Sequence, residues 1–467
     1  MALLATDKTT FHLLQLDDQL LPYSATVGSL PASVKEGEAK GEIHYTAYMR
    51  EGNGRPLTFV FNGGPGSSSV WLHMGAFGPR RIVTPEEGQS ATPPYELCDN
   101  GETLLDLTDL VFVDPIGTGL SRADSSETAQ EFYDSFGDVH SIGDFIRDFL
   151  TVNRRWNSPL YLAGESYGTF RCCGLSDYLQ SEHGIYPKGL ILISCAIDFQ
   201  TFLFDNDNFL PYSLYLPTYA ATAWYHGRCR PDATLEEVVE EARKFAFDSY
   251  APASWRPSRL SIKDRDTLYN QLAQLTGLPL NIIKREQGRI EEDTFLLEFF
   301  PDEKKVLGIY DTRVTGYYKN RQTHFGLDPS ITSIAGIFSG AFHHYMASEL
   351  DFPVSYLLFS TDINLRWEFK SYAPFGYPNF MDALRNSFIA NPDLKVFVGM
   401  GYFDAATPFA TAEYSFDHLN LPEGSIHSVQ KEYYEGGHMY YLNPSARKKF
   451  KQDLIRFYQG ELPCSGS

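Results

Sequence analysis

The sequence predicts an α/β fold in which a central, mostly parallel β-sheet is interrupted by a mainly helical insertion. Short apolar runs that end in glycine-rich turns recur through residues 1–198 and return in residues 360–467. Between them, residues 199–359 contain helix signals and few strand signals. Strands that alternate with helices favour this class, because parallel strands need long crossover connections. We therefore expect one sheet domain made of the two outer parts, with residues 199–359 inserted as a cap.

The expected strands are short runs rich in β-branched, aromatic and leucine residues. They lie at residues 42–48, 57–61, 110–113, 160–163 and 190–194, around residue 396 and at 426–434. In the insertion, Thr234 caps a segment with an acidic first turn, and residues 264–276 show a second helical pattern. A cap above the carboxyl ends of strands commonly sets specificity, although extra core helices would give the same pattern.

The stretch Gly164-Glu165-Ser166-Tyr167-Gly168 lies between a strand-like run, residues 159–163, and a helical segment, residues 169–179. This strand, turn and helix are typical of the nucleophile elbow of an α/β-hydrolase. The two glycines are needed because the serine is held in a strained backbone conformation with very close neighbours. The five residues alone also occur in ordinary turns, so the flanking strand and helix favour the elbow.

An elbow serine needs a base and an acid, which follow it in the order serine, acid, histidine. Asp404 follows the strand-like run 394–401, and His438 follows the run 426–434 after two glycines. A neutral imidazole accepts the serine proton during attack, and a carboxylate orients that imidazole. His343 and His344 lack such a setting, and we expect them on a helix.

A third glycine cluster, Asn62 to Ser69, follows the strand-like run 57–61. It lacks the lysine of a P-loop and the glycine spacing of a dinucleotide fold, so nucleotide binding is not expected. In a hydrolase, an early glycine loop supplies one oxyanion-hole amide, and the residue after the nucleophile supplies the other. Gly64 and Tyr167 are the candidate donors.

Several blocks, in this order along the chain, resemble the serine carboxypeptidase family. They are Asn62-Gly63-Gly64-Pro65-Gly66-Ser67-Ser68, Asp114 to Ser121, Gly164 to Gly168, Asp404, and Gly436-Gly437-His438-Met439. Ordered motifs across most of a chain are far more specific than one motif. The resemblance implies an α/β-hydrolase fold, a triad of Ser166, Asp404 and His438, and an oxyanion hole from Gly64 and Tyr167.

The resemblance also implies how a substrate is held. Family members bind the free C-terminal carboxylate of a peptide through the asparagine of the glycine loop and the glutamate before the serine, here Asn62 and Glu165. That glutamate would be protonated and share its hydrogen with the substrate, which fits the acidic pH preference typical of the family. A buried carboxyl beside a carboxylate has a raised pKa.

This chain departs from the family pattern at two positions. The second carboxylate-binding glutamate of the family, just before a Gly-Pro, falls at Ala76. Half of the acid pair is therefore missing, and we expect the acid optimum to be shifted or lost. At Ser67, family members from secretory compartments commonly carry a disulfide-bonded cysteine.

Composition sets outer bounds on function. The formal net charge of -20 argues against nucleic acid and anionic membranes as partners, and 43% hydrophobic content suits a large core. The six cysteines show neither a disulfide framework nor metal spacing, so most are expected to be free and buried. The N-terminus lacks a signal-sequence pattern. This favours a cytoplasmic location, whereas removal of a signal peptide would place the protein in a secretory or periplasmic compartment.

The leading hypothesis is a serine-type carboxypeptidase that releases C-terminal residues from peptides through an acyl-enzyme. A second hypothesis is an acyltransferase or esterase, which uses the same site with another acceptor or substrate. The absence of the second acid, at Ala76, favours this hypothesis. A third, a binding protein without catalysis, is disfavoured because all three triad residue types occur in order. The expected partner is a peptide or acyl substrate, with no cofactor and no metal. The oligomeric state is left open.

Overall fold

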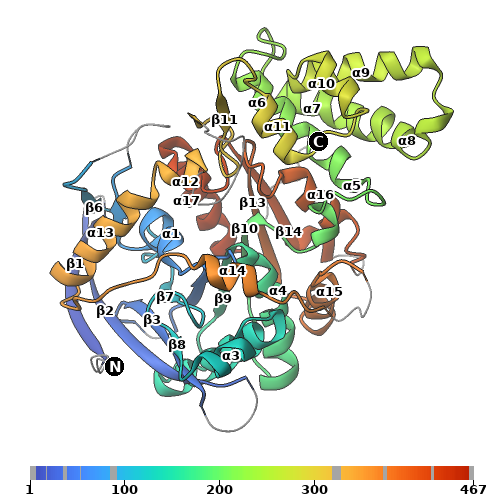
Figure 1. The fold of residues 1–467 in the computed structure, drawn as a ribbon. Helices are drawn as coiled ribbons and strands as arrows, with labels where there is room; N and C mark the ends of the chain where they lie inside the picture. Colours follow the sequence, from blue (N-terminus) through green and yellow to red (C-terminus); the bar gives the residue numbers. More distant parts are fainter. Residues whose placement is uncertain are drawn as a thin grey trace.

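The computed structural model describes residues 7–16, 18–34, 39–52, 54–84, 92–317, 328–371, 376–421 and 425–461. Figure 1 shows a body formed by a sheet with helices on both faces, and a helical unit that projects from one end. The layered α/β architecture predicted from the sequence is confirmed. Cys464 lies outside the described residues.

Within these residues, ten strands form the central sheet, in the order β1-β2-β3-β7-β4-β9-β10-β13-β14 with β8 beside β3. Their bounds are β1 Lys8–Leu16, β2 Gln19–Ala32, β3 Gly41–Met49, β4 Leu57–Phe61, β7 Asp109–Val113, β8 Arg122–Ala123, β9 Leu160–Ser166, β10 Gly189–Cys195, β13 Lys395–Gly401 and β14 Val429–Tyr434. The run from β7 to β14 is parallel, and β1, β2 and β3 join it antiparallel. Parallel strands are covered on both faces, which is why β4, β7 and β10 are buried throughout.

Alternation along each strand divides the apolar side chains between two cores. In β4, Phe59 and Phe61 join one core while Val60 joins the other. The first core is closed by α3 (Ser135–Val152), α4 (Tyr167–His183), α15 (Met381–Ala390) and α16 (Phe409–Asp417). The second is closed by α1 (Val70–Leu72), α13 (Ala335–Ser348) and α17 (Pro444–Gln459).

The helical unit has a third core of its own (Figure 1). It contains α6 (Leu216–Tyr225), α7 (Leu235–Phe245), α9 (Ile262–Thr276), α10 (Leu280–Arg285) and α11 (Glu292–Glu298). Thr234 caps α7 in a capping box with Glu237, as its sequence pattern predicts. The insertion expected at residues 199–359 also includes α13, which packs in the second core against the sheet rather than in the third.

Smaller elements connect these parts. They are α2 (Ser126–Ala129), α5 (Leu210–Leu214), α8 (Ala251–Ser254), α12 (Pro329–Thr332), α14 (Thr361–Arg366), β5 (Arg80–Ile82), β6 (Leu97–Asp99), β11 (Lys305–Leu307), β12 (Thr315–Tyr317), the π-helices η1 (His73–Phe77) and η4 (Ala246–Tyr250), and the short 3₁₀ helices η2 (Gln130–Phe132), η3 (Phe199–Thr201), η5 (Pro257–Arg259), η7 (Ser425–Ser428) and η8 (Tyr440–Leu442). Among the described helices, none is both long enough and apolar enough to cross a bilayer. The five cysteines in the described residues are all unpaired.

Candidate active site

Ser166 lies at the junction predicted from the sequence, because β9 ends at this residue and α4 begins at Tyr167. Its backbone has φ 59° and ψ −127°, a strained conformation for a residue with a side chain. A Cβ at Gly164 would lie 2.1 Å from the carbonyl oxygen of Gly168, and one at Gly168 would lie 2.9 Å from that of Phe61. The two glycines therefore permit the tight turn that exposes the serine hydroxyl.

The glycine loop after β4 passes directly against the start of α4. A Cβ at Gly63 would lie 2.5 Å from the backbone nitrogen of Tyr167. Tyr167 is the first residue of α4, and amides in the first turn of a helix have no intrahelical partner. Gly64, with φ +105°, adopts a conformation that favours glycine. This close approach brings the loop of Gly64 to the amide of Tyr167, as an oxyanion hole requires.

Asp404 and His438 meet across the ends of β13 and β14. His438 Nδ1 lies 2.8 Å from Asp404 Oδ2, and both side chains are buried. Asp404 Oδ2 also accepts a hydrogen bond from Thr407 Oγ1, while its Oδ1 accepts from the amides of Ala406 and Thr407. Four donors thus hold this carboxylate in one orientation, and it in turn fixes the imidazole.

The electrostatics of His438 favour its charged form. Burial alone would lower its pKa, but the charge of Asp404, the hydrogen bond to it, and the nearby Glu165 outweigh burial and raise the pKa above 6.5. A catalytic base benefits from this balance, because the imidazolium that forms during serine attack is stabilised.

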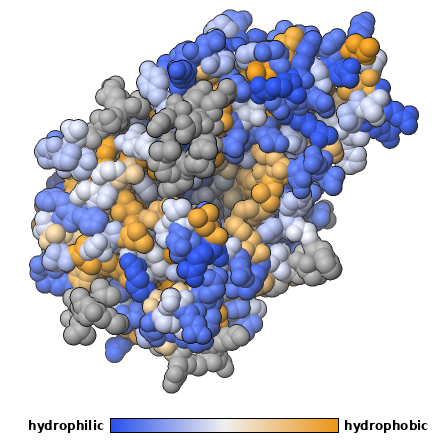
Figure 2. All heavy atoms as spheres, viewed as in Figure 1, coloured by the Kyte–Doolittle hydropathy of each residue, from blue (hydrophilic) through white to orange (hydrophobic). Residues whose placement is uncertain are grey.

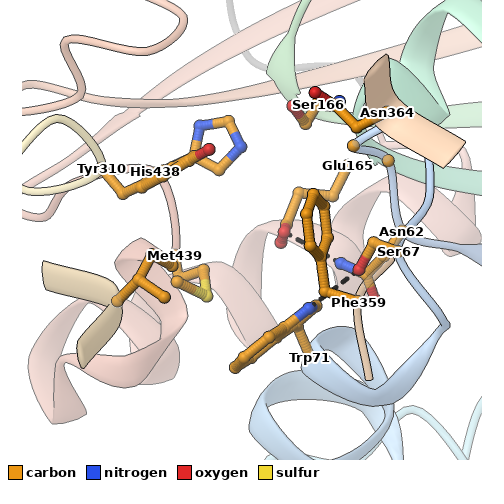
Figure 3. A pocket seen from close by; sticks show the side chains of 13 residues that line it. Asn62, Ser67, Trp71, Glu165, Ser166, Tyr310, Phe359, Asn364, His438 and Met439 are labelled. Atoms are coloured by element: carbon orange, nitrogen blue, oxygen red, sulfur yellow. Dashed lines mark hydrogen bonds between the residues drawn. The ribbon is translucent and has the colours of Figure 1, made fainter. Parts of the chain in front are cut away.

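One pocket is lined by five of the predicted site residues, Asn62, Gly64, Glu165, Ser166 and His438, whereas Asp404 and Tyr167 do not line it. Figure 2 shows a hollow on the face of the molecule in view, with hydrophobic residues gathered beside it. The pocket has a volume of about 120 Å³, which is below the usual range for whole drug-sized ligands. Figure 3 shows Ser166, Glu165 and His438 around it. Its lining residues are Asn62, Gly63, Gly64, Ser67, Trp71, Glu165, Ser166, Tyr310, Ile331, Phe359, Asn364, His438 and Met439.

Asn62 fixes the orientation of the Glu165 carboxyl. Asn62 Oδ1 accepts a hydrogen bond of 3.1 Å from the amide of Leu72, so its NH₂ group must point the other way. That group donates to Glu165 Oε1 over 2.9 Å, a bond drawn dashed in Figure 3. Because Oε1 already accepts a hydrogen, the proton of a neutral Glu165 is held on Oε2.

Glu165 holds a proton up to an unusually high pH. Burial raises its pKa to about 7, although His438, Tyr441 and Asn62 each act to lower it. Its side chain is 3% exposed. Glu165 is therefore a hydrogen-bond donor at acidic pH and largely a carboxylate above pH 7.

Several residues that support the site were not predicted from the sequence. The carbonyl oxygen of Tyr310, from the insertion, accepts the amide hydrogen of His438 over 2.6 Å, and the two rings meet edge to face. A Cβ at Gly437 would lie 2.1 Å from that oxygen, which explains the glycine before His438. Ser194 Oγ donates to the carbonyl oxygen of His438 over 2.7 Å. Only the fold brings these groups together.

The Asp114–Ser121 loop supports the glycine loop. Asp114 Oδ1 accepts hydrogen bonds from the amide and hydroxyl of Ser69 and from the hydroxyl of Tyr356. A Cβ at Gly119 would collide with the Asp114 carboxylate. His343 lies on α13, where its two ring nitrogens contact backbone groups, so it has a structural role.

A buried ion pair lies beneath the elbow. Arg171 Nε donates to Asp138 Oδ2 over 2.8 Å, and its NH1 donates to the carbonyl oxygen of Asn62 over 2.7 Å. The guanidinium also lies over the ring of Tyr167, 5.2 Å from its centroid. Arg171 and Asp138 are 1% and 2% exposed. The pair therefore anchors both the glycine loop and the first turn of α4.

Replacing Arg171 with methionine is expected to lower the free energy of unfolding by about 3–5 kcal/mol, because it leaves the Asp138 charge buried without a partner. Urea unfolding measures the loss. The control is Arg147→Met, which removes partly exposed ion pairs with Asp148 and Asp144 and should cost about 1 kcal/mol or less. Equal losses in the two variants would contradict the anchoring role.

Comparison with known proteins decides the family. The family profile described as serine carboxypeptidase matches residues 28–286, more than half of the chain. The chain belongs to the serine carboxypeptidase family. It is 25% identical over 228 residues to serine carboxypeptidase-like 33 of Arabidopsis thaliana, a match that covers 47% of this chain and 42% of that protein.

A second curated relative is the pheromone-processing carboxypeptidase KEX1 of Cryptococcus gattii, 32% identical over 158 residues, which are 31% of this chain and 22% of that protein. The chain thus spans less than half of the length of these curated relatives. Among solved structures, the prohormone-processing carboxypeptidase KEX1(delta)p of Saccharomyces cerevisiae has a TM-score of 0.57 at 15% identity, covering 94% of this chain and 92% of that one. This likeness supports the fold.

The two departures from the serine carboxypeptidase pattern are both buried in the structure. Ala76 lies in η1, where its carbonyl oxygen accepts a hydrogen bond from Asn100. Its methyl side chain supplies no carboxyl to the site. Ser67 Oγ accepts a hydrogen bond from the indole of Trp71 over 2.9 Å. The serine therefore fixes a ring of the pocket wall.

Proposed function

We propose that the protein is a serine-type carboxypeptidase that releases C-terminal residues from peptides through an acyl-enzyme. The observation that carries the proposal is the buried Glu165, which lines the pocket of Ser166 and His438 and whose Oε1 is held by Asn62. A protonated carboxyl oriented by an amide is a selective donor for a second carboxylate. A peptide carries one at its C-terminus, next to the bond to be cleaved.

The first half of the reaction forms an acyl-enzyme. Ser166 Oγ attacks the scissile carbonyl carbon as His438 Nε2 takes its proton. The amides of Gly64 and Tyr167 receive the negative oxygen, and Asp404 holds the imidazolium. When the intermediate collapses, His438 returns the proton to the leaving amine, and the C-terminal amino acid departs.

The second half restores the enzyme. Water enters, His438 Nε2 takes one of its protons, and the hydroxide attacks the acyl carbonyl. Collapse breaks the ester bond to Ser166, whose oxygen regains the proton from His438. The shortened peptide leaves with a new C-terminal carboxylate, which can in turn bind Asn62 and Glu165. In the described residues, the structure records no hydrogen bond from Ser166 to His438, and such contacts commonly close only in the substrate complex.

Product analysis by mass spectrometry tests this proposal. A peptide with a free C-terminus should lose single residues from that end, and a fluorophosphonate probe should label Ser166. An added amine should compete with water only weakly. Ester cleavage without peptide cleavage at every pH would replace the proposal with an esterase, and dominant transfer to the amine would replace it with an acyltransferase.

The variant Glu165→Gln is expected to remove the pH dependence of binding. Its side-chain carbonyl can accept from Asn62 while its NH₂ replaces the protonated Oε2. Since the pKa of Glu165 is raised to about 7, wild-type KM for free-acid peptides should rise as the pH passes 7, whereas KM of the variant should stay level. Steady-state kinetics from pH 5 to 9 measure this. An equal rise in both proteins would show that another group controls binding.

A further inference from the structure

Tyr441 lies next to the carboxylate site without lining the pocket. It belongs to η8, three residues after His438, and its side chain is fully buried. A Cβ at Gly75 would lie 2.8 Å from its ring, so the ring packs on the turn of η1 that carries Ala76. The tyrosine therefore fills space beside the position where the acid predicted from the family is missing.

Two buried polar atoms are left unsatisfied at this place. Among the described residues, neither Glu165 Oε2 nor Tyr441 Oη has a hydrogen-bond partner. An unpaired buried donor or acceptor is costly, and native structures leave few of them. The two groups are close enough that the hydroxyl of Tyr441 acts to lower the pKa of Glu165, and Glu165 raises that of Tyr441.

We propose that Tyr441 is a positioning residue for the substrate carboxylate: its hydroxyl donates to Glu165 Oε2 and turns the acid hydrogen of Glu165 toward the pocket. Asn62 donates to Oε1, so the proton of neutral Glu165 lies on Oε2, which keeps lone pairs that can accept a hydrogen bond. When the Tyr441 hydroxyl donates to one lone pair of Oε2, the acid hydrogen on Oε2 points toward the substrate. The hydroxyl of Tyr441 thereby supports Glu165, which has no second acid at position 76 to share the substrate carboxylate. The inference rests on the proposed carboxypeptidase function.

Other titratable groups also act on Glu165, so the test needs a close control. Those whose charge acts on Glu165, or on which Glu165 acts, are His438, Asp404, Tyr310 and Tyr440. Tyr440 is the matched control, because it adjoins Tyr441, its hydroxyl is likewise buried without a partner in the described residues, and its coupling to Glu165 is by charge alone.

The experiment compares Tyr441→Phe and Tyr440→Phe with the wild type. Each variant keeps its ring and loses one hydroxyl. The measurement is made at pH 5, where Glu165 is protonated in all three proteins. Tyr441→Phe should raise KM for a free-acid peptide about tenfold, because the charge-assisted hydrogen bond from Glu165 to the substrate carboxylate loses its orientation. Its kcat, and its activity on an uncharged ester, should stay near wild type. Tyr440→Phe should leave KM unchanged.

A second readout does not depend on the substrate. Difference infrared spectroscopy across pH follows the carboxylic acid band that disappears in Glu165→Gln. Loss of a donor to Oε2 destabilises the carboxylate, so the titration midpoint should move up by as much as about one pH unit in Tyr441→Phe. It should not move in Tyr440→Phe.

An unchanged midpoint and KM in Tyr441→Phe, or equal shifts in both variants, would overturn the positioning role. If wild-type enzyme fails to distinguish free-acid from amidated peptides, the proposed function fails, and the infrared midpoint still decides whether Tyr441 donates to Glu165.

Discussion

Replacing Ser166 with alanine is expected to lower kcat by on the order of 10⁴- to 10⁶-fold, because no other group can form the acyl-enzyme. KM should change little, since Asn62 and Glu165 remain in place. The strained backbone at Ser166 is tolerated by alanine, which also has one Cβ, so the fold should be kept. Stopped assays with long incubation and intact-mass analysis for an acyl adduct measure the loss.

The matched control is Ser67→Ala, a second serine of the same pocket. Its hydroxyl accepts from the indole of Trp71 and donates to the carbonyl oxygen of Ser68, so activity should fall less than about tenfold. If Ser166→Ala retained more activity than Ser67→Ala, the nucleophile would have to lie elsewhere.

Replacing Asp404 with asparagine is expected to lower kcat about 10⁴-fold, because it stabilises the tautomer of His438 that cannot accept the serine proton. The orientation of the new amide follows from the hydrogen bonds. Two backbone amides, those of Ala406 and Thr407, point at Oδ1, so the asparagine carbonyl must take that place. Its NH₂ group then faces His438 Nδ1, which must accept a hydrogen bond and leave the proton on Nε2. An imidazole in this form cannot take the serine proton.

The control for this variant is Thr407→Val, which removes one hydroxyl donor from Asp404 Oδ2 but keeps the carboxylate. We expect its kcat to fall no more than about tenfold. Kinetics on one ester substrate give both values, and circular dichroism checks the fold. Similar, small losses in the two variants would exclude Asp404 as the group that sets the tautomer.

The sequence predicts the parallel part of the sheet and the elbow well, because short-range patterns determine both. β4, β7, β9 and β10 are mainly apolar, and the glycines around Ser166 are required by contacts within a few residues or with the next strand. The first two strands are not predicted. In β1 the outward positions include Phe11 and Leu13, 83% and 65% exposed, so polarity does not follow the usual alternation.

The rest of the site depends on partners that are far apart in the sequence. Arg171 resembles a surface residue of a helix, yet it is buried against Asp138 and the loop of Asn62. Tyr310 comes from the insertion, and only the packed structure shows it against His438. Tyr441 follows the histidine motif closely, but its relation to Glu165 requires the fold. Sequence patterns predict the reacting groups, whereas the groups that orient them are set by tertiary contacts.

The central claim is that a protonated Glu165 beside Ser166 selects a free C-terminal carboxylate. The most direct test is the ratio of kcat/KM for an N-blocked dipeptide with a free carboxylate to that of its C-terminal amide, measured from pH 5 to 9. The account predicts a ratio of about 100 or more at pH 5, from two charge-assisted hydrogen bonds, that falls as Glu165 ionises around pH 7. An amide cleaved as efficiently as the free acid at pH 5 would contradict it.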